Sequence, residues 1–320
     1  MKHVCGVLIF VTLCVAQQGR AVAQVTPVSL DSVRALALDS IPGAAVAYFR
    51  PADRARAAEL QSLLAEYLEF YREHIGIDVR MRVAVLSSQD WARLTMIPYG
   101  LPNNSGPGTG NLLLAATSPP ERIGSREMPG GRTGDLLLIG HEGGHLLIWE
   151  LMPVQLKEGL TSPDTPQPEV MQRLQNVGSI PLWYMEMAAN YLTTAFVKAR
   201  SLDDADAWHA HLQAITEIAA PRYTHLGDWM SLLQAVAPDS TPYVFSVEGG
   251  LNQGWYQGVV GLAAAHIYEH AGLTFVEHIR SVVSGNAAPS TDELAQQLES
   301  IAPGITDLLA SLGAKWSKPD

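Results

Sequence analysis

The sequence predicts an α+β fold, with an N-terminal mixed α/β lobe that carries a small sheet and a mostly α-helical C-terminal lobe. Three observations predict it. Strand-like alternation and one long helical pattern share residues 24–151. Helical spacing dominates from residue 181 almost to the end. Apolar residues make up 47% of the 320-residue chain and charged residues 17%, which is enough for a sizeable core. We therefore divide the mature chain into lobes at residues 24–151 and 152–320.

The first 23 residues form a separate segment. A short basic start (MKH) precedes an apolar stretch (VCGVLIFVTLCVA), and a small-x-small site (AVA) stands before Gln24. This pattern is typical of a secretory signal peptide. Its apolar run is too short to span a bilayer well, and Cys14 follows Leu13 rather than a small residue, which disfavours a lipid-anchored form. We expect cleavage before Gln24, a secreted or periplasmic protein, and no stable membrane insertion afterwards.

The composition of the mature chain excludes several function classes. Cys5 and Cys14 are the only cysteines, so the mature chain has no disulfide and no thiol nucleophile. Removing Lys2 and Arg20 with the signal takes the formal net charge from −11 to −13. Because the acidic chain has no basic stretch, neither nucleic acid nor an anionic membrane surface is an expected partner.

The N-terminal lobe is expected to contain three strands and two helices before its last helix. Residues 44–50 (AAVAYFR) alternate and predict a strand. Residues 53–75 have helical spacing, and Gly76 fits a C-cap. In the second strand, residues 78–88, one face collects Val79, Met81, Val83 and Val85. A short helix at 89–96 and a third strand at 111–117 are separated by turn-rich loops at 98–110 and 118–132.

Thr133 can cap a helix over residues 134–151, which Pro153 follows. Residues 152–180 are polar and contain prolines, which predicts a surface excursion. The C-terminal lobe then has helical patterns over residues 181–200, 203–218, 227–236, 253–271, 273–284, 291–300 and 304–312.

The most apolar run of the chain contains two histidines and a glutamate: GRTGDLLLIGHEGGHLLIWEL. His141 and His145 are four residues apart, so on a helix they share one face and can bind one zinc ion. Glu142 points beside the metal, where it can take a proton from the attacking water. The alternative is a pair of core histidines bonded to backbone carbonyls. Gly143 and Gly144 cost about 1 kcal/mol each in a helix, which indicates that a neighbouring helix or a substrate backbone approaches closely there.

A third ligand candidate stands in the apolar helix PLWYMEMAANYLTTAF. Glu186 is its one acid, and a lone carboxylate in such a segment is expensive unless it is paired or metal-bound. The alternative is an acid on the solvent edge of this helix. Asn190, one turn further on, could accept a hydrogen bond from the far ring nitrogen of a ligand histidine.

The order His141-Glu142-x-x-His145, followed by Glu186-x-x-Ala189-x-Tyr191, resembles the gluzincin metallopeptidases, in particular the peptidase MA-like group. The resemblance implies a zincin-like catalytic domain with one Zn2+ per chain, held by His141, His145 and Glu186, and Glu142 as general base. It also suggests Tyr256, on a late helix, as the oxyanion donor, with Tyr243 and His266 as alternatives; a core role for Tyr256 remains equally open. The strand at 111–117 would be the free sheet edge that pairs with an extended peptide.

Two other histidine motifs compete with this interpretation. HIYEH (266–270) is the inverted zinc motif, but only 50 residues follow His270, too few for that class of peptidase. We expect a structural or pocket-lining role for it. WHAH (208–211) has no further ligand nearby and is interpreted as a solvated helix face.

The expected function is that of a secreted zinc metallopeptidase, which hydrolyses peptide or protein substrates. Two alternatives stay open: a zinc hydrolase of a non-peptide substrate on the same scaffold, and a non-catalytic binding protein that retains the fold. The intact Glu142 argues against the binding protein.

Overall fold

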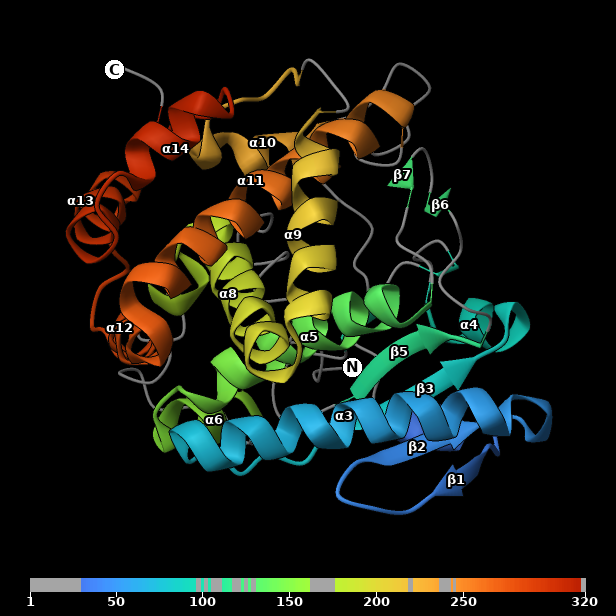
Figure 1. Cartoon of the computed structure of the whole chain (residues 1–320). Coiled ribbons are helices and arrows are strands. Elements are labelled where there is room, and N and C mark those ends of the chain that lie inside the picture. Colours follow the sequence, from blue (N-terminus) through green and yellow to red (C-terminus); the bar gives the residue numbers. More distant parts are fainter. Residues whose placement is uncertain are drawn as a thin grey trace, which may run out of the picture.

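The structure, a computed structural model, is mixed α and β and mostly helical (Figure 1). It describes residues 30–95, 99–100, 103–104, 111–116, 122–123, 126–127, 131–161, 176–217, 221–235, 243 and 246–317. The predicted signal peptide and the predicted cleavage site before Gln24 lie outside these residues.

A five-stranded sheet in the order β1-β2-β3-β5-β4 builds the N-terminal part. The inner strands β2 (Val46–Phe49), β3 (Arg82–Leu86) and β5 (Asn111–Ala115) are parallel. The edge strands β1 (Asp39–Ile41) and β4 (Asn103–Asn104) run antiparallel to their neighbours. The three strands predicted from alternation are confirmed, because they are β2, β3 and β5.

The prediction that residues 111–117 form a free sheet edge is wrong. Asn103 and Asn104 of β4 pair with Leu113 and Leu112, so β5 has a neighbour on both sides. The sequence did not predict β4 because a strand of two residues inside a turn-rich loop is too short to show the alternation of apolar and polar residues that identifies strands. The outermost strand on this side of the sheet is β4.

Helix α3 (Arg54–Ile75) connects β2 to β3 and crosses one face of the sheet (Figure 1). It ends, as predicted, at Gly76, whose φ of 67° suits a residue without a Cβ. Val83 and Val85 join the main core with α3, while Ala84 and Leu86 point to a second cluster on the other face. Both faces of the parallel strands are thereby covered, as such strands require.

The second cluster is closed by α2 (Leu30–Arg34) and α4 (Ser88–Leu94), through Val33 and Trp91. A small hairpin of β6 (Arg122–Ile123) and β7 (Arg126–Glu127) follows the sheet. Helix α5 (Gly131–Glu150) then carries both histidines of the HEGGH sequence. It begins three residues before the predicted start, so Thr133 lies inside the helix rather than at its cap.

The rest of the chain is helical. Helix α6 (Val154–Thr161) lies within residues 152–180, where the proline content predicted only a surface excursion; residues 162–175 are outside the described part. The later helices agree with the predicted ones except that α11 begins six residues early. They are α8 (Leu182–Arg200), α9 (Leu202–Glu217), α10 (Trp229–Gln234), α11 (Val247–Ala271), α12 (Phe275–Ser284), α13 (Thr291–Ile301) and α14 (Ile305–Ser311).

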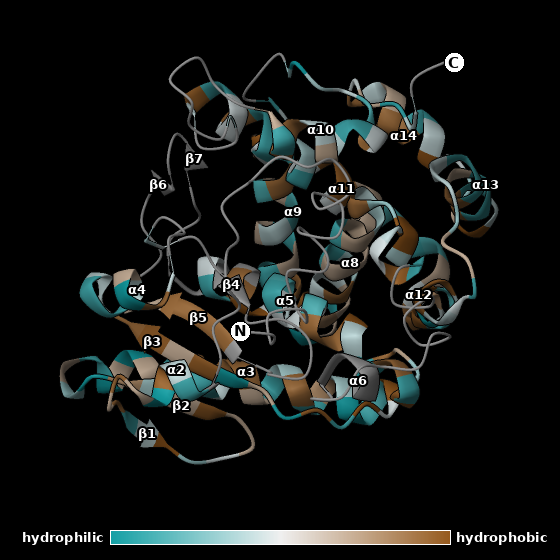
Figure 2. Ribbon diagram, turned by 180° about the vertical axis from the view of Figure 1, so that it is seen from behind, coloured by the Kyte–Doolittle hydropathy of each residue, from teal (hydrophilic) through white to brown (hydrophobic). Residues whose placement is uncertain are grey.

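One cluster of buried apolar side chains runs through both lobes, from Ala45 on the sheet side to Ala314 near the C-terminus. Figure 2 shows hydrophobic residues concentrated on the inner strands and on the inward sides of the helices. The stretch Val247–Ser284 is apolar enough to cross a membrane by length and composition, but 56% of its most apolar window is buried inside the protein. We therefore interpret α11 as the central core helix of the C-terminal half.

Candidate metal centre

Helices α5 and α8 approach each other closely because small residues line their contact. A Cβ on Gly144 would lie 2.9 Å from the Ala189 carbonyl oxygen and 3.0 Å from the Ala189 Cα. A Cβ on Gly140 would lie 2.7 Å from Cγ2 of Thr193. Moving from Gly140 to Gly144 goes from Thr193 back to Ala189, so the two helices are antiparallel here. The predicted close approach at the glycine pair is confirmed for Gly144, and the approaching element is a helix.

Helix α3 packs against α5 and also bonds to α8. A Cβ on Gly143 would meet the Tyr67 ring at 2.9 Å, and the Tyr67 hydroxyl donates to the Gly140 carbonyl at 3.0 Å. One turn later, the Tyr71 hydroxyl donates to the carbonyl of Leu192 on α8. Both tyrosines are fully buried, and burial raises their hydroxyl pKa values well above the ordinary range. They therefore remain neutral donors that tie α5 and α8 to α3.

This packing brings His141, His145 and Glu186 together. The Nε2 atoms of His141 and His145 lie 3.3 Å apart. Oε2 of Glu186 lies 3.2 Å from His141 Nε2, and Oε1 lies 3.6 Å from His145 Nε2. All three side chains are 14–17% exposed, so they are shielded but reachable. The predicted convergence of residues 45 positions apart on two helices is present, and the cluster could hold a metal ion.

The spacing of these atoms fits a small tetrahedral cation. Ligands at bonds of about 2 Å in a tetrahedron lie about 3.3 Å from each other. The 3.3 Å between the two Nε2 atoms and the 3.2 Å from His141 Nε2 to Glu186 Oε2 are close to that value, whereas the 3.6 Å from His145 Nε2 is measured to the other carboxylate oxygen, Oε1. Two imidazole nitrogens and a carboxylate converge on one point, and such lone-pair donors repel one another unless a proton or a cation lies between them.

Glu186 and His145 shift each other's pKa values. Burial alone would raise the pKa of Glu186, but His145 and His141 outweigh it and hold this pKa well below its usual range. For His145, burial would lower the pKa, and the carboxylates of Glu186 and Glu142 reverse this and raise it. Glu186 is therefore an anion that is ready to bind a cation, and Glu142 is close enough for its charge to act on His145.

Glu142 is buried, with 8% of the residue exposed. It follows His141 directly on α5 and therefore projects beside the imidazole pair rather than along the same line. Its role as a general base stays a prediction. The predicted ligand set and the predicted base thus come from neighbouring positions on one helix plus one position on α8.

Sequence reasoning missed Gln257 on α11. Its amide nitrogen donates to Oε2 of Glu186 at 2.7 Å. Asn190 was expected to accept from a histidine, but its amide nitrogen donates to the Glu186 carbonyl at 2.9 Å and to Oε1 of Gln257 at 3.1 Å. No hydrogen bond among the described residues joins Asn190 to either histidine. No motif signalled Gln257, because glutamine is common on helices and its partner is 71 residues away.

Tyr256, suggested as the oxyanion donor, has a place in the core. Its ring is fully buried and stacks on Trp229 with centroids 4.8 Å apart. Its hydroxyl donates to the carbonyl of His225 at 2.7 Å. The alternative weighed from the sequence, an aromatic packed beside Trp255, matches this environment. The structure therefore gives Tyr256 a packing contact, and no described hydrogen bond links it to the metal-binding cluster.

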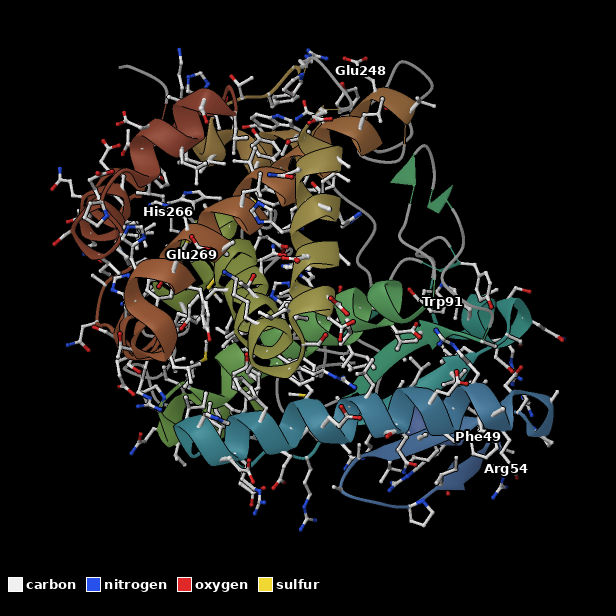
Figure 3. All side chains as sticks on the ribbon, viewed as in Figure 1. Phe49, Arg54, Trp91, Glu248, His266 and Glu269 are labelled. Carbon is white, nitrogen blue, oxygen red and sulfur yellow. The ribbon has the colours of Figure 1, made fainter. Side chains whose placement is uncertain are left out.

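Tyr243 and His266, the two alternative candidates for the oxyanion donor, also make their described contacts with residues outside the metal-binding cluster. The Tyr243 ring packs near Tyr223. His266 Nε2 lies 3.1 Å from the Pro303 carbonyl oxygen. Figure 3 shows Glu248 and Glu269 at opposite ends of α11, with His266 in the same half of the helix as Glu269.

His266 lines a separate pocket between α9, α11 and α14, with a volume of about 520 Å³. His209 of the WHAH motif lines it too. This agrees with the pocket-lining role expected for HIYEH. It also means that WHAH, interpreted as a solvated face, contributes its first histidine to the rim of a pocket.

No protein-family model matches the chain. A search of curated proteins finds no match either.

Proposed function

We propose that this protein is a zinc metallopeptidase. The observation that carries the proposal is the convergence of His141, His145 and Glu186, with Glu142 next to His141 on the same helix. Two imidazoles and one carboxylate are the protein ligands of catalytic zinc in known metallopeptidases. Among the described residues three side chains converge, which would leave a fourth position for water or substrate, whereas structural zinc sites are closed by four protein ligands.

When bound, zinc supplies Lewis acidity, which lowers the pKa of water and polarises a carbonyl group. Glu142 accepts the proton of the attacking water and then donates it to the leaving amine, so the same carboxyl group serves as base and acid. His141 and His145 would hold the ion from α5, and Glu186 would hold it from α8. The buried position of Glu142 limits competing water and strengthens its interaction with charges nearby.

The sequence features support a substrate outside the cell. A signal peptide ending before Gln24 would export the chain, and a net charge of −13 after its removal disfavours nucleic acid as the substrate. Peptide or protein chains are the substrates of the gluzincins that the motifs resemble. A non-peptide substrate on the same scaffold is the second candidate, since a fold does not fix a substrate.

The test combines metal analysis with cleavage profiling. Purified protein should contain about one zinc per chain and cleave members of a peptide library, and a chelator should abolish cleavage until zinc is restored. Glu142→Gln should keep the metal and lose cleavage. Bound zinc without cleavage of any peptide, in wild type, would refute the peptidase and leave the other hydrolase. Equal cleavage by wild type and Glu142→Gln would refute the proposed chemistry.

A further inference from the structure

The structure assigns Gln257 and Asn190 as a positioning relay that holds the third metal ligand, Glu186, in its binding orientation from the central helix α11. This inference rests on the proposed metal site. It concerns how the affinity for metal arises, and its two residues act through Glu186 rather than as ligands.

The contact between Gln257 and Glu186 is the shortest polar contact of the Glu186 carboxylate among the described residues: the Gln257 amide nitrogen donates to Oε2 at 2.7 Å. A hydrogen bond to an ionised acceptor is shorter and stronger than one between neutral groups. Gln257 approaches from α11, whereas the two histidines approach from α5. The carboxylate is thus held between two helices, and its rotation about the side-chain bonds is restricted before any ion arrives.

Asn190 decides which end of the Gln257 amide faces Glu186. A carboxylate can only accept, so the Gln257 nitrogen must face it. The Gln257 oxygen then needs a donor, and the Asn190 amide nitrogen supplies one at 3.1 Å. The same nitrogen donates at 2.9 Å to the Glu186 carbonyl, one helical turn earlier on α8. Because Asn190 is 2% exposed, water has little access to replace it.

The relay holds the ligand without adding charge. A lysine or arginine in place of Gln257 would also bind the carboxylate, but its positive charge would compete with a cation for it. A neutral amide donates a hydrogen bond and leaves the negative charge of Glu186 available. Partners of this kind, which orient a ligand from behind, typically contribute 10–100-fold to metal affinity.

The test is a double-mutant cycle on zinc affinity, measured by competition with a chromogenic chelator. Gln257→Met keeps the length of the side chain and removes the donor, and zinc should bind about 10–100-fold more weakly. Asn190→Leu keeps the shape and should weaken binding by a smaller factor, because Gln257 can still turn its nitrogen to Glu186. The double variant should be no worse than Gln257→Met alone, since Asn190 acts through Gln257. The visible spectrum of bound Co2+ should shift in Gln257→Met, because the ligand carboxylate is held differently.

Gln253→Met is the matched control. Gln253 lies one turn earlier on α11 and accepts a hydrogen bond from Trp229 Nε1 at 2.7 Å, so its loss removes a comparable bond outside the cluster. Its zinc affinity and Co2+ spectrum should equal those of wild type. Wild type without zinc would refute the proposed function itself. Zinc-binding wild type with affinity unchanged in Gln257→Met would refute only the relay, as would additive losses in the double variant. If Gln257→Met does not fold, Asn190→Leu decides: unchanged affinity there overturns the relay.

Discussion

Replacing Gly144 by alanine should weaken metal binding although the residue is not a ligand. The new Cβ would lie 2.9 Å from the Ala189 carbonyl oxygen and 3.0 Å from the Ala189 Cα. Ordinary contact needs about 3.5 Å, so the helices must separate by about 0.6 Å at this point. Both obstacles are backbone atoms of α8, which cannot move without moving the helix.

The displacement reaches the metal site because Ala189 is one turn from Glu186 on α8. Metal–ligand bonds tolerate about 0.2 Å, which is less than the required separation. We expect zinc affinity to fall about 10–100-fold, as when a ligand loses its support. Stability changes less: alanine gains about 1 kcal/mol of helix propensity, and overpacking costs about 1–3 kcal/mol. The net result is a loss between zero and about 2 kcal/mol.

Gly143→Ala is the comparison variant, because it gains the same propensity but meets the Tyr67 ring of α3 at 2.9 Å rather than α8. Zinc competition and urea unfolding of the metal-free proteins measure both quantities. Gly144→Ala should lose more zinc affinity than Gly143→Ala. A Gly144→Ala protein that is about 1 kcal/mol more stable, with unchanged zinc affinity, would show that the close approach of α5 and α8 has no role in the site.

Three further predictions concern single side chains. Glu142→Gln should retain zinc while kcat on a cleaved peptide falls about 10²–10⁴-fold; full turnover would remove Glu142 as the base. Elemental analysis should show that Glu186→Ala and His141→Ala each lose zinc. A variant that keeps one full zinc per chain would show that the replaced residue is not a ligand. Tyr256→Phe loses the bond to the His225 carbonyl, so unfolding should cost about 1 kcal/mol less with turnover unchanged; a fall of about 10²–10³-fold in a folded protein would instead make Tyr256 the oxyanion donor.

The sequence was informative where a pattern repeats or a motif has fixed spacing. Alternation identified the inner strands, and helical spacing with Gly76 identified α3 and its end. The HEGGH spacing and one acid in an apolar helix singled out His141, His145 and Glu186. The structure brings these three together.

Other features left no local signal. Strand β4 has two residues, so it was missed and β5 was wrongly expected at the edge. Helix α6 stands next to a proline-containing segment that predicts irregular chain. Gln257 acts only through contacts made by folding, and the Tyr256 hydroxyl finds its carbonyl 31 residues away. A sequence motif records spacing within one element, so it does not indicate partners that become neighbours only through tertiary packing.

The two tyrosines of α3, Tyr67 and Tyr71, connect this helix to the candidate metal site without giving it a ligand. A fragment that begins at α5 would keep all three candidate ligands, Glu142 and the relay. It would lack Tyr67 and Tyr71, whose hydroxyls bond to carbonyls on α5 and on α8. Through those bonds, helix α3 fixes the distance between α5 and α8. We therefore expect changes around Tyr67 and Tyr71 to alter the affinity for metal, although α3 supplies no candidate ligand.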